Sequence, residues 1–543
     1  MRVRPFIILA SAFSGFQAQA QRLAPGSDTV LKGSTIEVIQ SYKPRVKQSP
    51  KPDWKPQLPP MDTTRPSFKT DVPQQTLYYS YYSPPLRPLA LGKNLNELPY
   101  QNYVKAGGGN LSTIYLDAGI GSIKKENYET GIHLHHISQK GNIVHQQSSL
   151  SGVEAAGSLH NEKGDFNASL SGSHNRYYQY GYDHILHNYN NETVAQAYTA
   201  VRLAGDMINR KDTSSRIDYQ PSIKATYYGA KFNTSEISAS FLAPVVYKLN
   251  KSLDLRANVA GAIASYNAAG TTIANNYVLA APGVGMQFNE YYSAHALAGF
   301  AYGKGGSTYF LPDAEVAFTM RDYLFRLSIG YKADLRQNTY EQMTMENPFM
   351  VSSYRVVQTK RDEIFAAVQG SLGNHFSYSA RGSWWNYFDL PTFLNDTGDN
   401  RTFYALYQNV KAVSAQASAR YQDANKWSAG LTGEWYYFYS STDTKVWHTP
   451  SVNIKGDFQM AVTRKLDVSF YGVVMGGIKA RDIAGNTIDL KTIADMGVGG
   501  EYKLIPRLSA FVQFNNILNS KYQRWMGYQV YGFNVYGGLR LKF

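Results

Sequence analysis

The fold is decided by a stretch of strict alternation that reads LDLRANVAGAI at positions 253–263. Its odd-numbered positions are apolar or small, whereas its even-numbered positions include Asp254 and Arg256. Successive side chains of a β-strand point to opposite faces, so this period of two predicts a strand with one apolar and one polar face. Full charges in the middle of such a strand suit a water-filled interior.

The same alternation recurs along the chain. Residues 165–172 and 466–474 repeat it, and the chain ends in FNVYGGLRLKF at positions 533–543. A soluble β-sandwich would also alternate. However, aromatic residues gather at strand ends, at 384–385 and 435–439, as in the interfacial girdles of membrane barrels. We therefore expect an all-β fold, namely a single transmembrane antiparallel β-barrel.

Connections between the expected strands alternate between short and long. Short turns fall at sites such as 250–251 and 464–465, whereas long polar loops cover 183–191, 341–359 and 389–406. Outer-membrane barrels have short periplasmic turns and longer external loops, so this asymmetry predicts the orientation. Counting back from the C-terminus, with two strands for each short turn, gives about 22 strands. The predicted barrel domain covers residues 99–543.

The first twenty residues indicate export. Arg2 and Arg4 precede an apolar stretch at 6–16, and residues 18–20 read Ala-Gln-Ala, a signal-peptidase pattern. We expect residues 1–20 to be a cleaved signal peptide. No later segment supplies about 20 consecutive apolar residues, so no transmembrane helix is expected. The expected location is the bacterial outer membrane, with the protein as an integral component.

Residues 21–98 differ sharply from the rest of the chain. Of the 22 prolines, 13 lie between Pro25 and Pro99. Proline removes backbone donors and favours extended geometry, so this segment cannot build a packed domain. We expect an unfolded, proline-rich periplasmic arm.

Composition narrows the partners and the chemistry. The formal net charge is +14, yet no basic helix or RNA-binding motif is present, and an exported chain rarely meets nucleic acid. We therefore expect no nucleic-acid partner. The basic residues are expected to face outer-membrane lipid, lipopolysaccharide phosphates or an anionic solute. The chain has no cysteine, which excludes a thiol nucleophile, a disulfide framework and a cysteine zinc site.

The C-terminal residues resemble those of TonB-dependent receptors. The run NNILN at 515–519, followed by Lys521-Tyr522, Trp525 and the terminal Phe543, is similar to the last strands of that family. The resemblance implies a barrel of 22 strands, matching the count above. It also implies that Phe543 is part of the signal by which the barrel-assembly machinery recognises its clients.

The chain departs from that family at its N-terminus. A TonB-dependent receptor carries a globular plug of well over a hundred residues, whereas fewer than eighty mature residues precede the first expected strand here. The chain thus resembles the barrel half alone. The β-prone island Thr35-Ile36-Glu37-Val38 is similar to a TonB box, which implies TonB, or another periplasmic protein, as a partner. A chance β-prone segment is the alternative.

One cluster could carry metal chemistry. On a strand, His133 and His135 would share a face with Glu129, and imidazole and carboxylate are suitable ligands for transition metals. The alternative, which we favour, is a pair of polar side chains wetted by the lumen. No local motif pairs a nucleophile with a base, so no catalytic residue, enzyme activity or cofactor is expected. The glycine-rich segment at 106–110 is interpreted as a turn between the first two strands.

On these grounds we expect passage or uptake of a solute across the outer membrane, with the +14 charge favouring anionic solutes. The alternative is a barrel scaffold that anchors a surface or periplasmic assembly. A lumen of this size would leak, so the arm, inward loops or a partner protein must close it.

Overall fold

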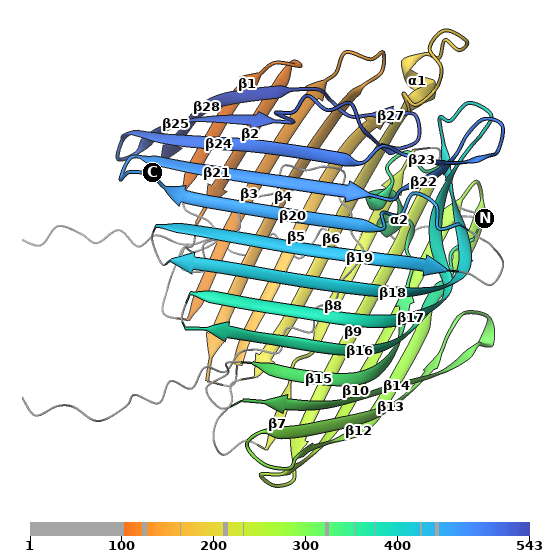
Figure 1. Cartoon of the computed structure of the whole chain (residues 1–543), viewed down its shortest axis with the longest axis vertical. Helices are drawn as coiled ribbons and strands as arrows, with labels where there is room; N and C mark the ends of the chain where they lie inside the picture. The colour runs from red at the N-terminus through yellow and green to blue at the C-terminus, as the bar shows by residue number, and fades with distance from the viewer. Residues whose placement is uncertain are drawn as a thin grey trace, which may run out of the picture. The chain divides into compact units, whose positions relative to one another are not determined.

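The barrel is a single closed antiparallel sheet of 22 strands, as the sequence predicted (Figure 1). The computed structural model describes residues 102–121, 127–162, 164–209, 216–231, 233–320, 325–352, 355–373, 375–423, 426–439 and 445–543. The signal peptide at 1–20, the arm at 21–98 and the island Thr35-Ile36-Glu37-Val38 lie outside the described residues and stay predictions.

The barrel strands are, in chain order, β1 (Tyr103–Gly109), β2 (Thr113–Ile120), β3 (Tyr128–Lys140), β4 (Gln147–Asn161), β5 (Gly164–Tyr178), β6 (Ala195–Asn209), β8 (Ser222–Ala230), β9 (Thr234–Lys248), β10 (Leu253–Ala268), β12 (Tyr277–Gln287), β13 (Tyr292–Tyr302), β14 (Thr308–Thr319), β15 (Arg326–Gln337), β16 (Gln358–Leu372), β17 (Phe376–Asn395), β18 (Phe403–Asp423), β19 (Trp427–Tyr439), β20 (Val452–Ala461), β21 (Leu466–Gly476), β24 (Ile493–Ile505), β25 (Leu508–Asn515) and β28 (Asn534–Lys542). The shorter elements are β7 (Ile217–Tyr219), β11 (Thr271–Ala274), β22 (Lys479–Arg481), β23 (Thr487–Asp489), β26 (Gln523–Trp525), β27 (Tyr528–Gln529), α1 (Asn191–Val194), α2 (Tyr340–Glu346) and the 3₁₀ turn η1 (Lys304–Gly306).

Glycines line the seam where the first and last strands meet. β1 pairs with β28 over seven residue pairs, among them Gly107 with Gly538 and Gly108 with Gly537. A Cβ on Gly538 would collide with the backbone oxygen of Ala106. The glycine-rich segment at 106–110 therefore belongs mainly to the seam. The turn between the first two strands lies a few residues later than predicted, at 110–112.

The two faces of the wall follow the alternation in the sequence. On β10, the apolar side chains of Leu255, Val259 and Ile263 are exposed on the outer face. On the opposite face, Arg256 donates to Asp254 over 2.6 Å. An apolar exterior and a polar interior are typical of membrane-spanning barrels. Among the described residues, no helix is long and apolar enough to cross a membrane.

The two ends of the barrel differ as predicted. At one end, connections such as 249–252 and 462–465 are short, whereas the other end carries long connections such as 179–194 and 338–357. The loop predicted at 389–406 is shorter than expected, because β17 and β18 extend into it and leave only residues 396–402 as their connection.

Candidate functional site, a loop folded into the barrel

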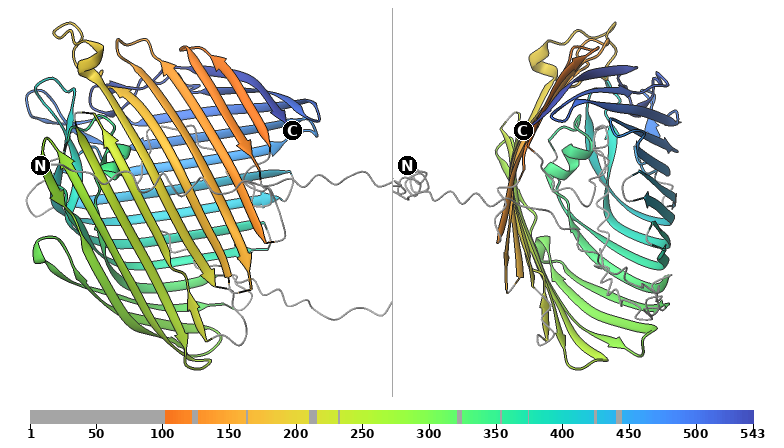
Figure 2. Two further views of the ribbon diagram at one scale, coloured as in Figure 1. Left: turned by 180° about the vertical axis from the view of Figure 1, so that it is seen from behind. Right: turned by 90° about the vertical axis from the view of Figure 1, so that its left-hand side faces the viewer.

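The connection between β15 and β16 does not stay outside the barrel. Its residues 338–352, here called the inward loop, contain α2, which lies between the two walls of the barrel (Figure 2). Thr339 caps this short helix, since its side chain accepts a hydrogen bond from the backbone N–H of Gln342 over 3.1 Å. The inward loop therefore has a defined structure at the end of the barrel that carries the long connections.

Aromatic and methionine side chains anchor the inward loop. Tyr340, Met343, Phe349 and Met350 are buried in one apolar cluster. Val356, from the same connection, also belongs to the cluster. Its other members come from the wall and from other connections: Tyr198, Ala200, Tyr228, Tyr266, Ala268, Phe393, Phe403, Trp525 and Tyr528. Because these side chains come from strands on both sides of the loop, the cluster bridges the lumen.

The closest ring contact joins the inward loop to the last long connection. The rings of Phe349 and Tyr528 stack with their centroids 3.5 Å apart. Tyr180, from the connection after β5, packs edge-on against both rings. Met350 and Phe403 also form a parallel β-bridge at the start of β18. Two connections and the start of β18, which are far apart in the sequence, thus meet on the inward loop.

Polar contacts fix the same loop to the wall formed by β6, β8 and β9. Arg202 forms an ion pair with Glu341 over 2.5 Å. The hydroxyl groups of Tyr228 and Thr344 lie 2.6 Å apart, within hydrogen-bond distance. Glu236 is almost fully buried, and its carboxylate accepts a hydrogen bond from the backbone N–H of Tyr340 over 2.7 Å. These contacts satisfy polar groups that would otherwise be buried without partners.

We predict that breaking the ion pair loosens the inward loop. In an Arg202→Met variant, the Glu341 carboxylate is left largely buried without its cationic partner, which costs about 3 kcal/mol for a buried pair. The expected result is more frequent channel openings in planar bilayers. Arg256→Met is the matched control, because Arg256 pairs with Asp254 on the wall and should leave the opening frequency unchanged.

A buried histidine supports the other side of the cluster. His448, in the connection after β19, donates from Nδ1 to the carbonyl oxygen of Phe393 over 2.6 Å. Burial lowers the pKa of His448 to about 3, so the ring is neutral and its Nε2 accepts from the backbone N–H of Met526 over 3.3 Å. This side chain is a structural support whose protonation state is fixed at physiological pH.

We expect Glu346, at the end of α2, to make closure of the loop sensitive to pH. Burial raises its pKa from 4.5 to about 7, although the positive charges of Arg524 and Arg336 act in the opposite direction. A carboxyl group with a raised pKa holds its proton in the closed state and loses it when the loop reaches water. Closure is therefore strongest at acid pH and weakens as the pH rises from about 4.5 to about 7.

The expected result is that opening frequency in planar bilayers rises across that interval and then levels off. A Glu346→Gln variant, which has no proton to lose, should show a flatter profile. A profile that is equally steep in both proteins would rule out Glu346 as its source.

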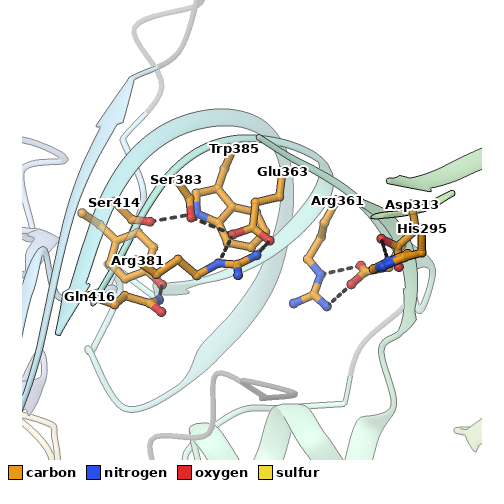
Figure 3. A network of polar contacts seen from close by, with 11 residues as sticks. His295, Asp313, Arg361, Glu363, Arg381, Ser383, Trp385, Ser414 and Gln416 are labelled. Carbon is orange, nitrogen blue, oxygen red and sulfur yellow. Dashed lines mark hydrogen bonds and ion pairs between the residues drawn. The ribbon is translucent and has the colours of Figure 1, made fainter. Parts of the chain in front are cut away.

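Beyond the inward loop, the lumen wall carries charged side chains that pair with each other (Figure 3). Arg361 makes two hydrogen bonds to Asp334, of 2.7 and 2.6 Å. Arg381 makes two to Glu363, both of 2.7 Å, and Ser383 donates to the same carboxylate. Bidentate pairs of this kind are strong and geometrically specific. The described part of the wall is therefore polar but locally neutralised.

The histidine cluster singled out in the sequence is part of this polar wall. His133 lies 3.0 Å from the carboxylate of Asp117 on the neighbouring strand, and the rings of His133 and His135 stack with centroids 5.9 Å apart. Within the described ranges, no group of three His, Asp or Glu side chains is arranged to hold a metal ion. These residues fit the interpretation as paired polar side chains of the lumen.

The structure also places Phe543, the predicted assembly signal. Its backbone N–H donates to the carbonyl oxygen of Asn102 over 3.0 Å, next to the β1–β28 seam, and its ring is exposed. The role in assembly stays a prediction. The sequence predicted a long loop at 341–359 and inward loops as one way to close the lumen, but it did not identify this loop as the one that enters the barrel. The run YEQMTMENPFM at 340–350, unusually rich in apolar residues for a loop, was the available signal.

Comparison with known proteins places the fold. No protein-family model matches the sequence, and no curated protein matches it. Among solved structures, the FrpB iron transporter from Neisseria meningitidis (F3-3 variant) matches with a TM-score of 0.61 and 10% identity, over 83% of this chain and 82% of that chain. The siderophore receptor PirA from Acinetobacter baumannii matches with a TM-score of 0.59 and 10% identity, over 81% and 79%.

The pyoverdine outer-membrane receptor FpvA from Pseudomonas aeruginosa PAO1 also has a TM-score of 0.59 and 10% identity, over 82% of this chain and 78% of that chain. Identities this low establish the fold alone. That fold is the outer-membrane β-barrel of the TonB-dependent receptors, which the C-terminal residues and the strand count had predicted.

Proposed function

We propose, from the premise that this chain is an outer-membrane barrel of TonB-dependent-receptor type, that it passes a solute across the outer membrane and that the inward loop is its gate. The observation that carries the proposal is the position of α2 between the walls of a barrel of 22 strands. A barrel of this size encloses a lumen wide enough for solutes, so a loop packed across it controls passage.

The chemistry of the contacts supports a gate rather than a permanent seal. Apart from the β-bridge between Met350 and Phe403, the inward loop is anchored by side-chain contacts such as the Arg202–Glu341 ion pair and the stacked rings of Phe349 and Tyr528. Methionine side chains adapt to new packing partners, because the unbranched thioether chain is flexible and its contacts are not directional in the way that a β-ladder is. The loop is thus able to leave the lumen without unpairing the barrel strands.

Because the charged side chains of the lumen wall pair with each other, we expect the pore to select solutes only weakly by their charge. Of the +14 excess, the first 101 residues supply half, with 13 Lys and Arg against 6 Asp and Glu (13 − 6 = 7). The lumen charges form pairs such as Arg361 with Asp334. We therefore replace the expectation of an anionic solute with that of a polar solute selected by size and hydrogen bonding.

This inference predicts the selectivity of an opened pore. With residues 340–350 replaced by a short linker, the reversal potential in a potassium chloride gradient should lie close to zero. The measurement is made in planar bilayers, with the potassium chloride concentrations on the two sides differing by about threefold or more. A strongly anion-selective pore would restore the original expectation.

Energy input is a separate part of the proposal. The TonB-box-like island Thr35-Ile36-Glu37-Val38 would pair with an edge strand of TonB, and an Ile36→Pro substitution would prevent that pairing. If TonB drives the gate, uptake stops in this variant while the barrel still assembles. Unchanged uptake would show that passage is driven by the concentration gradient alone.

The function is tested by locking the gate reversibly. Met350 and Phe403 are partners in a β-bridge, so cysteines at both positions lie at a distance that a disulfide can span. The natural chain has no cysteine to interfere. Depletion of small molecules from rich medium is compared by mass spectrometry between cells with the wild-type protein, the double-cysteine variant and each single-cysteine variant.

At least one solute should be depleted by wild-type and single-cysteine cells, spared by the double variant, and depleted again after reduction. Identical profiles from all of these cells would contradict a transport function.

A further inference from the structure

On the outer face of β3, β4, β5 and β6, the side chains change from apolar to polar towards the end of the barrel that carries the long connections. Lower on these strands the outward side chains are apolar, for example Leu134, Val153, Leu170 and Val201, all exposed. Beyond them, at outward positions of the same strands, the side chains are polar or basic. This outer polar patch consists of Ser138, Lys140, His136, Ser149, Ser151, His174, Arg176 and Thr199.

Strand register brings these residues together. His136 is opposite Ser151, Ser151 is opposite His174, and His174 is opposite Thr199, so the four form one row across four strands. Hydrogen bonds run along the row, with 2.8 Å between His136 and Ser151 and 2.9 Å between His174 and Thr199. The row therefore presents ordered imidazole and hydroxyl groups towards the membrane boundary.

Basic side chains lie in the rows just beyond. Arg176 is opposite Ser149, and its guanidinium lies 5.4 Å from the ring centre of Tyr178. Lys140, at the end of β3, is exposed. The outward positions of these four strands, which are all described, carry no carboxylate, because their Asp and Glu residues face the lumen. On the outward face of these four strands, the positive charges of Lys140 and Arg176 are therefore not accompanied by a carboxylate.

The other side of the barrel is built differently at the same kind of position. On β17 and β19 the outward side chains near the long connections are aromatic, and the indole N–H of Trp384 donates to the hydroxyl of Tyr439 over 2.5 Å. Trp435 and Tyr437 are exposed beside them. Aromatic side chains are the usual residues of membrane barrels at the membrane–water interface. At the outer polar patch, polar and basic side chains occupy those interfacial positions instead.

We propose that the outer polar patch binds the phosphorylated head group of lipopolysaccharide in the outer leaflet. Phosphate groups of that lipid lie just outside the hydrocarbon layer, where the apolar rows of β3–β6 end. Arginine and lysine supply charge, while histidine and serine supply hydrogen-bond donors for phosphate oxygens. A lipid held there would fix the position of the barrel and its adjoining loops in the membrane. This inference does not depend on the proposed transport function.

The test uses purified, lipid-free protein in detergent, titrated with intact lipopolysaccharide, with dephosphorylated lipopolysaccharide and with inorganic phosphate. Binding is followed by native mass spectrometry. The variant combines Lys140→Ser, His174→Ser and Arg176→Ser. The matched control is Lys411→Ser, because Lys411 is an exposed basic residue on β18, next to the aromatic boundary. Folding of every variant is checked by its heat-dependent migration on gels.

We expect the triple variant to bind intact lipopolysaccharide about tenfold more weakly than wild-type protein, since each basic group near such a head group contributes to the affinity. The control variant should bind normally, and the wild-type protein should discriminate against the dephosphorylated lipid. Equal binding of the two lipids by wild-type protein would overturn the proposal, as would equal loss of affinity in the control. Saturation by inorganic phosphate alone would assign the patch to a free anion and would also overturn it.

Discussion

Replacing residues 340–350 with a short flexible linker is expected to convert a closed barrel into a permanently open pore. The replaced segment supplies Tyr340, Met343, Phe349 and Met350, the side chains that the inward loop contributes to the cluster across the lumen. Strands β15 and β16 are paired neighbours, so a short linker joins them without strain. Conductance in planar bilayers should increase at least about tenfold, because the lumen of so wide a barrel then fills with water.

The control for this experiment replaces only the exposed tip of another long connection. Residues 184–187 form the exposed tip of the connection between β5 and β6, where Ile185 is 94% exposed. Their replacement should leave conductance at the wild-type level. If the 340–350 variant also stays closed, the inward loop is not the barrier, and the residues outside the described ranges become the next candidate.

A Gly538→Val substitution is expected to prevent closure of the barrel. A Cβ at this position would meet the backbone oxygen of Ala106 and the Cα of Gly107 across the β1–β28 seam. Overpacking of a well-packed site costs about 1–3 kcal/mol, and here the obstructing atoms are backbone atoms that cannot rotate away. We expect loss of the heat-modifiable, protease-resistant form of the protein in isolated outer membranes.

The matched control for the seam is Gly382→Val on β17. Gly382 lies on a barrel strand like Gly538, yet a Cβ there would have no other atom within 4 Å. This variant should assemble like the wild-type protein, since valine also favours the strand conformation. Normal assembly of Gly538→Val would show that the seam tolerates a separation of β1 from β28.

The barrel was predictable from sequence because its determinants are local. Period-two alternation, such as Leu253 to Ile263, specifies both the strand and the face that meets lipid. Short turns between such segments fix the count, which the structure confirms at 22. Lipid outside and water inside impose the same pattern on every strand, so no long-range information is needed.

The gate was not predictable, because its position depends on tertiary contacts. The sequence predicted a long loop at 341–359, and nothing local states that Phe349 will pack on Tyr528, almost 180 residues away along the chain. The same limit explains why the glycines at 107–109 were assigned to a turn. Glycine is required at positions 107 and 109 because the backbone of β28 approaches closely across the seam, and β28 lies more than 400 residues away in the sequence.

The net charge of the chain was a poor guide to the charge of the solute, because it also depends on where the fold places each residue. The sum over the chain is +14, but it does not separate residues that face the lumen from those that face lipid or precede the barrel. Arg381 faces the lumen and is neutralised by Glu363, whereas Arg176 faces outwards with no carboxylate on its face of the strand. The position of each charge, which the fold determines, decides what the protein attracts.

The central claim, a barrel closed by its own inward loop, is tested most directly by cysteine labelling in intact cells. The chain has no native cysteine, so Leu186→Cys and Thr344→Cys each introduce a single reactive site. Leu186 is exposed on a long connection, whereas Thr344 is buried in α2 against Tyr228. A membrane-impermeant maleimide should label Leu186→Cys rapidly and leave Thr344→Cys unmodified. Labelling of both positions at the same rate would contradict the account.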